Sequence, residues 1–173
     1  MDISDRNFTF GDAAMDEHTI KDMVNRLDEL TPKLIFEFGS GTSTLFLANW
    51  AQENGARVIS LDHLKQYADK TRNLCAGLKV EVQHAPLRNG MYNFKIPNNI
   101  DFALIDGPPA YSPQGRVHVF PALWPHLSSN FEVWLDDANR KHEQKCLQQW
   151  SNKFPISFEI DSTGKGLAII RPK

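Results

Sequence analysis

The chain has 173 residues, of which 41% are hydrophobic and 23% charged, and its formal net charge is −2. A chain of this length and composition fits one globular domain with one substantial core. It lacks the basic excess of a nucleic-acid-binding protein, so we expect no nucleic-acid partner. The first residues are acidic and no apolar stretch approaches the roughly 20 residues that span a bilayer, so we expect no membrane partner and a cytoplasmic location.

Apolar residues recur at helix and strand spacings in alternation along the chain. The first predicted helix covers residues 16–30 and ends before Pro32, so we expect an N-terminal arm at 1–15 and a single domain at 16–173. The sequence then predicts strands at 34–38, 57–61, 79–84, 100–105, 131–135, 156–160 and 166–171, and helices at 43–54, 64–76, 115–127 and 138–152.

This alternation of strands and helices predicts an α/β fold. Each parallel connection needs a crossover, so the pattern indicates a doubly wound parallel sheet with helices on both faces. Several strands are continuous apolar runs, which is typical of strands buried on both sides. The turn-rich link at 161–166 makes the last two strands an antiparallel hairpin. We therefore predict a seven-stranded, mostly parallel sheet with a C-terminal antiparallel hairpin at its edge.

Acidic residues stand at the ends of four of the predicted strands. They are Glu37, Asp62, Asp106 and the pair Asp136 and Asp137. In open sheets of this kind, ligands bind outside the carboxyl ends of the strands. One such acid alone is as often a turn residue or a helix cap as a functional group. Four acidic strand ends at the same edge indicate one polar crevice.

The first strand leads through the glycine-rich turn Gly39-Ser40-Gly41 into a helix. A dinucleotide-binding turn needs a third glycine three residues after the second, where this chain has Thr44, so the sequence does not favour an NAD site. A phosphate-binding loop is excluded because no lysine follows the turn until Lys65. An acid two residues before the first glycine suits a cofactor that carries positive charge.

The string Glu37-Phe38-Gly39-Ser40-Gly41-Thr42-Ser43, the acid after the second strand and the strand order together resemble the class I S-adenosylmethionine-dependent methyltransferases. The resemblance extends from about residue 16 to the end and implies a Rossmann-like methyltransferase fold. It also implies S-adenosylmethionine as the cofactor, with its amino group near Glu37, its ribose on Asp62 and its adenine near His63 and Ala85. The implied cofactor-binding residues are Glu37, Gly39, Ser40, Gly41, Ser43, Asp62, His63, Ala85 and Asp106. Ser43 stands where many family members have a third glycine.

The acids after the fourth and fifth strands resemble a metal site of this family. Asp106, Asp136 and Asp137 stand where two aspartates and an asparagine hold Mg²⁺ in enzymes such as catechol O-methyltransferase. A divalent ion there would prefer oxygen ligands and lower the pKa of an acceptor hydroxyl. The lysine base of catechol O-methyltransferase is replaced by Pro109. Two alternatives stay open: Mg²⁺ or another divalent metal at the three aspartates, or Asp136 or Asp137 as the cap of the following helix.

The resemblance implies methyl transfer to a small-molecule acceptor. The site chemistry favours a hydroxyl oxygen, with Asp106 or Asp137 as the base. Methylation of nitrogen is an alternative, although Asp106-Gly107-Pro108-Pro109 departs from the Asp/Asn-Pro-Pro-aromatic string of amino-methyltransferases. A non-catalytic cofactor-binding or interaction protein with the same fold is another alternative.

Two arginines are candidate ligands for an anionic group of the substrate. Arg116 lies in the segment after the fourth strand, and we expect Arg140 in the first turn of its helix, where the helix dipole disfavours a cation. The alternative for Arg140 is an exposed, solubilising side chain. A second copy of the chain, in a homodimer, is a candidate partner, since a small single-domain enzyme can complete its acceptor pocket with a second subunit.

Overall fold

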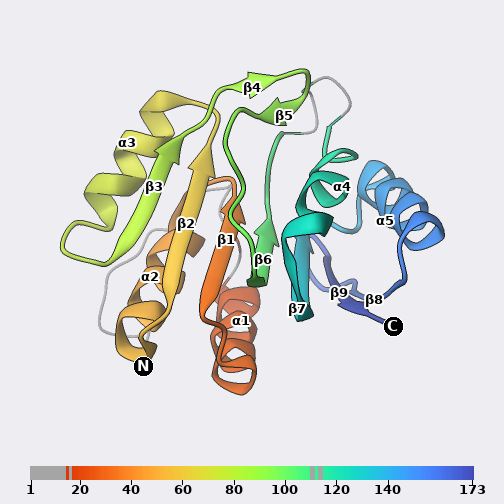
Figure 1. Ribbon diagram of the computed structural model, residues 1–173, viewed down its shortest axis with the longest axis horizontal. Helices are drawn as coiled ribbons and strands as arrows, with labels where there is room; N and C mark the ends of the chain where they lie inside the picture. The colour runs from red at the N-terminus through yellow and green to blue at the C-terminus, as the bar shows by residue number, and fades with distance from the viewer. Residues whose placement is uncertain (1–14, 16, 110–111, 113–114) are drawn as a thin grey trace.

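The computed structural model describes residue 15, residues 17–109, residue 112 and residues 115–173. Within these residues lies a seven-stranded sheet with the strand order β3-β2-β1-β6-β7-β9-β8 (Figure 1). Its parallel strands are β1 (Leu34–Phe38), β2 (Arg57–Asp62), β3 (Val80–His84), β6 (Ile100–Ile105) and β7 (Leu127–Asp136). The strand β9 (Leu167–Pro172) pairs antiparallel with both β7 and β8 (Ile156–Asp161). The predicted doubly wound sheet with its C-terminal hairpin is confirmed.

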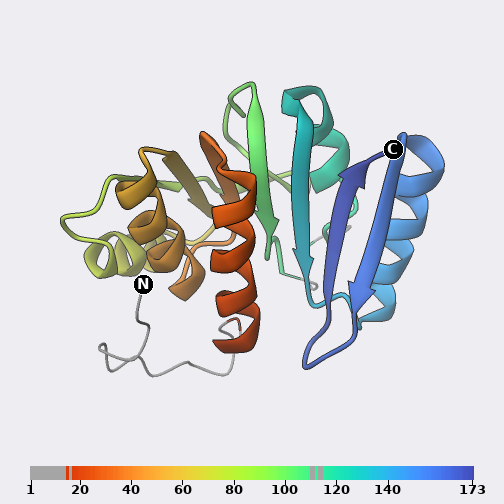
Figure 2. The same cartoon turned by 90° about the horizontal axis from the view of Figure 1, so that it is seen from below.

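Helices cover both faces of this sheet (Figure 2). On one face, α1 (Glu17–Leu30) and α2 (Thr42–Asn54) pack on strand residues such as Ile35 and Phe102. On the other face, α4 (Val119–Leu123) and α5 (Lys141–Lys153) pack on the alternate strand residues, such as Phe36 and Ala103. The helix α3 (Lys65–Leu74) lies along β2 and β3. Because neighbouring strand residues point to opposite faces, each strand contributes to both cores.

A small hairpin lies in the segment between β3 and β6, where the sequence predicted an irregular connection. Its strands are β4 (Leu87–Arg88) and β5 (Met91–Tyr92), joined by Asn89 and Gly90 with φ of 51° and 79°. Positive φ at both residues is typical of the two-residue turn that an Asn-Gly pair favours. The hairpin places Tyr92 against the main sheet, with its ring centroid 5.6 Å from that of Phe38.

Two predicted helices have different bounds in the structure. The expected helix at 115–127 is the short α4 followed by a 3₁₀ turn, Trp124–His126. Pro121 is tolerated in the first turn of α4, where a backbone N–H has no partner within the helix, but Pro125 lies beyond that turn and an α-helix cannot continue through it. The helix α5 begins at Lys141 rather than at 138, because Asp137 has a φ of 63° and Arg140 is extended.

The expected N-terminal arm falls mostly on residues 1–14, which lie outside the described residues. Met15 is buried in the core that α1 and α2 form on the sheet, together with Ile20 and Met23. Along the described part of the chain, no helix is long and apolar enough to cross a membrane.

Candidate functional site

The glycine turn lies at the carboxyl end of β1, in contact with the end of β6. Gly39 has a φ of 98°, and a Cβ at this position would lie 2.9 Å from the carbonyl oxygen of Asp106. Gly39 is therefore required by its backbone conformation and by the close approach of the segments that follow β1 and β6. A Cβ on Gly41 would have no described atom within 4 Å, so the backbone before α2 borders open space. The turn presents backbone at the strand ends, as a cofactor cradle requires.

Glu37 lies beneath this turn with no exposed surface. Its carboxylate accepts hydrogen bonds from the hydroxyls of Ser43, Thr44 and Ser60. The Thr44 hydroxyl in turn accepts the N–H of Gly41 at 2.9 Å. Burial raises the pKa of Glu37 to about 7, against the opposing effect of the three hydroxyl donors. Glu37 thus holds the turn from within, and Ser43, at the position of the missing glycine, supplies one of its donors.

Asp62 ends β2 beside the turn. Its Oδ2 accepts the N–H and the hydroxyl of Ser40 at 3.3 and 3.1 Å, and its Oδ1 accepts the N–H of Leu64 at 2.9 Å. These bonds fix the carboxylate. Oδ1 keeps acceptor capacity, and Oδ2 regains it when the Ser40 hydroxyl donates instead to Oγ1 of Thr71, which lies 3.1 Å away. His63 lies next to it, half-buried, and the N–H of Ala85 donates to the carbonyl of Asp62 at 2.7 Å. The expected ribose and adenine residues therefore lie together at the ends of β2 and β3.

Tyr92, from the β4–β5 hairpin, is a site residue that sequence reasoning missed. Its hydroxyl is buried, and no group in the described ranges bonds to it. A Cβ on Gly107 would lie 2.1 Å from this hydroxyl, so the tyrosine fills the space that a side chain at 107 would need. Burial raises the pKa of Tyr92. The available signal was the Asn89-Gly90 pair, which marks the hairpin but not what the hairpin contacts.

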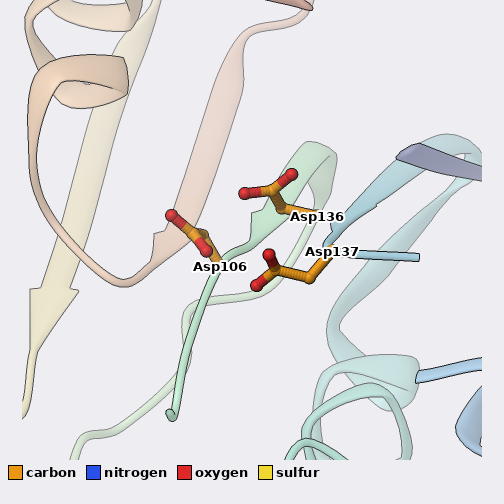
Figure 3. Close-up of side chains that lie close together, drawn as sticks. All are labelled: Asp106, Asp136 and Asp137. Atoms are coloured by element: carbon orange, nitrogen blue, oxygen red, sulfur yellow. The ribbon is translucent and has the colours of Figure 1, made fainter. Parts of the chain in front are cut away.

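The aspartates at the ends of β6 and β7 gather into one cluster (Figure 3). Carboxylate oxygens of Asp106, Asp136 and Asp137 all lie within 4.8 Å of one another. The Asp106 side chain is 25% exposed, whereas Asp136 and Asp137 are buried. Burial, followed by repulsion from Asp136, raises the pKa of Asp106 well above its usual range, and Arg116 opposes this. Burial and the neighbouring Asp137 also raise the pKa of Asp136.

Arg116 lies inside this cluster rather than on a surface facing a substrate. Its side chain is 2% exposed. Nη2 lies 3.2 Å from Oδ1 of Asp106 and 3.0 Å from Oδ2 of Asp137. The guanidinium also donates to the carbonyl oxygens of Asp106, Pro108 and Asp136 at 3.1, 3.3 and 2.7 Å. The expected role as a ligand for a substrate anion does not fit this environment, because protein acceptors surround the guanidinium.

The turn after β7 corrects two expectations. Arg140 does not lie in the first turn of α5 but is its N-cap residue, with a φ of −74° and a ψ of 138°. Asp136 and Asp137 are therefore too early in the chain to cap this helix. Instead, Oδ2 of Asp137 lies 2.6 Å from Nη1 of Arg140, whose side chain is 50% exposed. This half-exposed cation is thus paired with the aspartate cluster.

The three aspartates supply oxygen ligands of the kind that Mg²⁺ prefers. However, the guanidinium of Arg116 contacts two of them, and Arg140 also pairs with Asp137. A divalent ion would have to displace a buried cation from carboxylates that it already neutralises. The described arrangement therefore does not fit a metal.

A sequence model of the methyltransferase-domain family matches residues 36–138, which is more than half of the chain, so the protein belongs to this methyltransferase family. The match begins within β1 and ends just after β7, and it includes the glycine turn, Asp62 and the three aspartates. The predicted resemblance to the class I methyltransferases is thereby confirmed. No curated protein matches the sequence.

Solved methyltransferase structures share the fold. An O-methyltransferase from Bacillus cereus in complex with SAH (S-adenosylhomocysteine) is 18% identical, with a TM-score of 0.73 over 95% of this chain and 84% of that one. An SAH-bound methyltransferase from Podospora anserina is 16% identical, with a TM-score of 0.72 over 94% and 81%. The O-methyltransferase TomG from Streptomyces achromogenes, in complex with SAM and involved in tomaymycin synthesis, is 14% identical, with a TM-score of 0.70 over 94% and 82%.

We predict that Gly107→Ala lowers the free energy of unfolding because its Cβ would meet the Tyr92 hydroxyl at 2.1 Å. The expected loss is about 1–3 kcal/mol, as for other overpacked cores. Tyr92→Phe in the same chain should restore part of it, and urea unfolding of the two single variants and the double variant measures the coupling. Gly41→Ala, where a Cβ meets no described atom within 4 Å, is the control and should change stability by less than about 0.5 kcal/mol. An equal loss with and without the tyrosine hydroxyl would show that this oxygen is not the obstacle.

We also predict that Glu37 makes the fold less stable as pH rises. Its pKa is raised from an ordinary value of 4.5 to about 7, so between these values the folded state binds the extra proton. The contribution of Glu37 to stability is therefore fully present below pH 4.5 and is lost as pH rises through about 7, by about 3 kcal/mol in total. Glu37→Gln removes this ionisation. Between pH 5 and pH 8 the free energy of unfolding of the variant should therefore rise relative to that of the wild type by about that amount.

Urea unfolding at several pH values measures the difference in stability between the wild type and Glu37→Gln. The contributions of the other titrating groups cancel in this difference. Glu81→Gln, at the exposed ion pair with Arg57, is the control and should follow the wild-type curve. A difference between wild type and Glu37→Gln that stays constant with pH would contradict the prediction.

Proposed function

We propose that this protein transfers the methyl group of S-adenosylmethionine to a hydroxyl oxygen of a small molecule. The contact of the glycine turn with the segment that carries Asp106 is the observation that supports this most strongly. The Cβ position of Gly39 lies 2.9 Å from the carbonyl oxygen of Asp106, so the cofactor cradle borders a carboxyl group whose pKa is raised. A methyl donor on the turn and an acceptor at the aspartates would therefore be neighbours.

The residues present suit this cofactor. Backbone at Gly39 and Gly41 borders the open space before α2, where the positive end of the helix favours the carboxylate of the methionine part. Asp62 has a fixed carboxylate that can accept two ribose hydroxyls, one on Oδ1 and one on Oδ2 once the Ser40 hydroxyl donates to Thr71 instead. His63 and Ala85 border the same place at the ends of β2 and β3, where the adenine would lie. Because Glu37 has no exposed surface, it would not contact the amino group directly but would hold the backbone turn that receives this group.

The sulfonium supplies an already activated methyl group. Asp106 would take the proton of the acceptor hydroxyl as its oxygen forms the new bond to the methyl carbon. The bound cofactor would supply the methyl carbon and keep the electron pair of the broken carbon–sulfur bond on sulfur, which would leave a methyl ether, S-adenosylhomocysteine and a protonated Asp106. Burial and the neighbouring Asp136 raise the pKa of Asp106, which makes its carboxylate a stronger base than an ordinary aspartate. Alignment of acceptor and methyl group can supply about 7–11 kcal/mol of the barrier.

Oxygen is favoured over nitrogen as the acceptor atom by the chemistry of the cluster. A hydroxyl must lose its proton as it attacks, and the partly exposed Asp106 provides a base at that point. A neutral amine attacks with its own lone pair and can release its proton afterwards. Two of the proteins with this fold, from Bacillus cereus and Streptomyces achromogenes, are O-methyltransferases.

We predict that the protein binds S-adenosylhomocysteine saturably and that Asp62→Asn weakens this binding about 10- to 100-fold. That range corresponds to the roughly 1.5–3 kcal/mol of a hydrogen bond to a charged group. Isothermal titration calorimetry measures both affinities. Asp69→Asn, on the exposed face of α3, is the matched control and should bind as the wild type does. Absence of saturable binding to the wild type at millimolar concentration would reject the cofactor.

We further predict that Asp106→Asn lowers kcat about 10²- to 10⁴-fold, the usual contribution of a positioned acid or base. Because Asp106 is also one of the expected cofactor-binding residues, the affinity for S-adenosylhomocysteine is measured in parallel, and the loss in kcat should exceed the loss in affinity. The assay follows S-adenosylhomocysteine release with a panel of phenols, catechols and aliphatic alcohols. Wild-type activity should fall as pH drops through the raised pKa of Asp106, since the base is then protonated. Wild-type kcat in the variant would remove Asp106 from the mechanism.

A further inference from the structure

We infer that Arg116 takes the place of a divalent metal at the three aspartates, so that the reaction proposed above proceeds without a metal ion. This inference rests on the proposed function for its consequence, but its structural part stands on the contacts of the arginine alone. A buried guanidinium already occupies the position between Asp106 and Asp137 that a shared cation would need.

Backbone contacts fix this guanidinium independently of the carboxylates. Nη1 donates to the carbonyl oxygen of Asp136 at 2.7 Å, and Nη2 and Nε donate to the carbonyl oxygens of Asp106 and Pro108. These acceptors belong to the segments that follow β6 and end β7. The side chain is 2% exposed, so it has no route to water without opening the cluster. Arg116 is therefore a built-in part of the strand ends.

The charges of the cluster lead to the same conclusion. Three carboxylates are balanced by Arg116 and by the half-exposed Arg140. That leaves one negative charge in the cluster. A divalent ion added to this set would make the site positive. An ion that replaced Arg116 would leave a buried guanidinium without its partners, which is strongly unfavourable.

The substitution of a guanidinium for a metal changes the chemistry that is available. A metal can bind the acceptor oxygen directly and lower its pKa. A guanidinium only donates hydrogen bonds and keeps its charge at all working pH values. The acceptor proton must then go to a carboxylate, and Asp106 is the most exposed of the three. Arg116 is thus a positioning residue, which orients Asp106 and limits the repulsion from its neighbours.

Titration of the full-length protein with MnCl₂ tests the inference without any need for an acceptor. The protein is first freed of metals with EDTA, which is then removed, and binding is followed by calorimetry and by the electron paramagnetic resonance signal of free Mn²⁺. We expect no saturable binding to the cluster of the wild type up to millimolar Mn²⁺. We expect Arg116→Met, which removes the charge but keeps much of the volume, to bind Mn²⁺ at least tenfold more tightly.

Matched variants locate any Mn²⁺ that binds. Arg72→Met on α3 removes an arginine from the exposed Asp69 and should create no site. Asp136→Asn in the wild-type background removes one potential ligand. Stoichiometric Mn²⁺ binding to the wild type that is lost in Asp136→Asn would overturn the inference. Mn²⁺ binding that persists in Asp136→Asn lies elsewhere and agrees with it.

Failure of a variant to fold and failure of the proposed function can both be told apart from metal binding. If Arg116→Met does not fold, as judged by circular dichroism and thermal melting, the wild type and Asp136→Asn still decide the question. Titration of the same wild-type sample with S-adenosylhomocysteine tests the proposed function separately. A protein that binds the cofactor product and also binds Mn²⁺ at Asp136 would keep its proposed function and lose this inference. Arg116→Lys should stay metal-free because it retains the positive charge.

Discussion

The close approach of the β1 and β6 carboxyl ends is the constraint on which the site depends. The backbone N–H of Asp106 donates to the carbonyl of Phe38 at 2.8 Å, and no side chain fits at Gly39, because its Cβ would meet the Asp106 carbonyl. A Cβ on Gly107 would meet the Tyr92 hydroxyl and would also lie 3.3 Å from the backbone nitrogen of Gly39 and from the carbonyl oxygen of Phe38. Both glycines are therefore needed for this one close contact. The contact brings the cofactor turn and the first aspartate of the cluster to the same point.

Buried acids are stabilised in two different ways around this contact. Glu37 is surrounded by hydroxyl donors and has no cationic partner among the described residues, and its pKa is raised mainly by burial. The aspartates are crowded together, and a buried guanidinium compensates them. The first arrangement keeps the turn rigid without adding charge. The second holds charge at the strand ends, where the proposed proton transfer would take place, in line with electrostatic preorganisation.

Much of the fold could be predicted from the sequence, because continuous apolar strands and the order of elements are local signals. The glycine turn and the acids at the strand ends were also visible, since each lies beside its own strand. The role of Arg116 was not visible. Its partners are Pro108 and Asp106 nearby and Asp136 and Asp137 far along the chain, so only the folded structure brings them together.

Other differences follow from signals that are short or ambiguous. Two-residue strands such as β4 and β5 show no alternation, so only the Asn89-Gly90 pair marked them. Acidic residues before a helix predict a cap, but Asp137 adopts a positive φ and the helix starts after Arg140. The residues that suggested a cap thus form a turn, and the carboxylate of Asp137 lies beside those of Asp106 and Asp136.

The C-terminal hairpin explains how that turn is held. The N–H groups of Ala138 and Asn139 donate to the carbonyls of Gly166 and Lys165 at 2.9 and 3.1 Å, and the Asn139 side chain donates to the loop at Ser162 and Gly164. A Cβ on Gly166 would lie 2.6 Å from Asn139, so the loop packs directly against the turn. A non-glycine residue at positive φ persists when its surroundings determine it. The edge hairpin therefore does more than close the sheet, because it fixes the backbone from which Asp137 reaches Arg116.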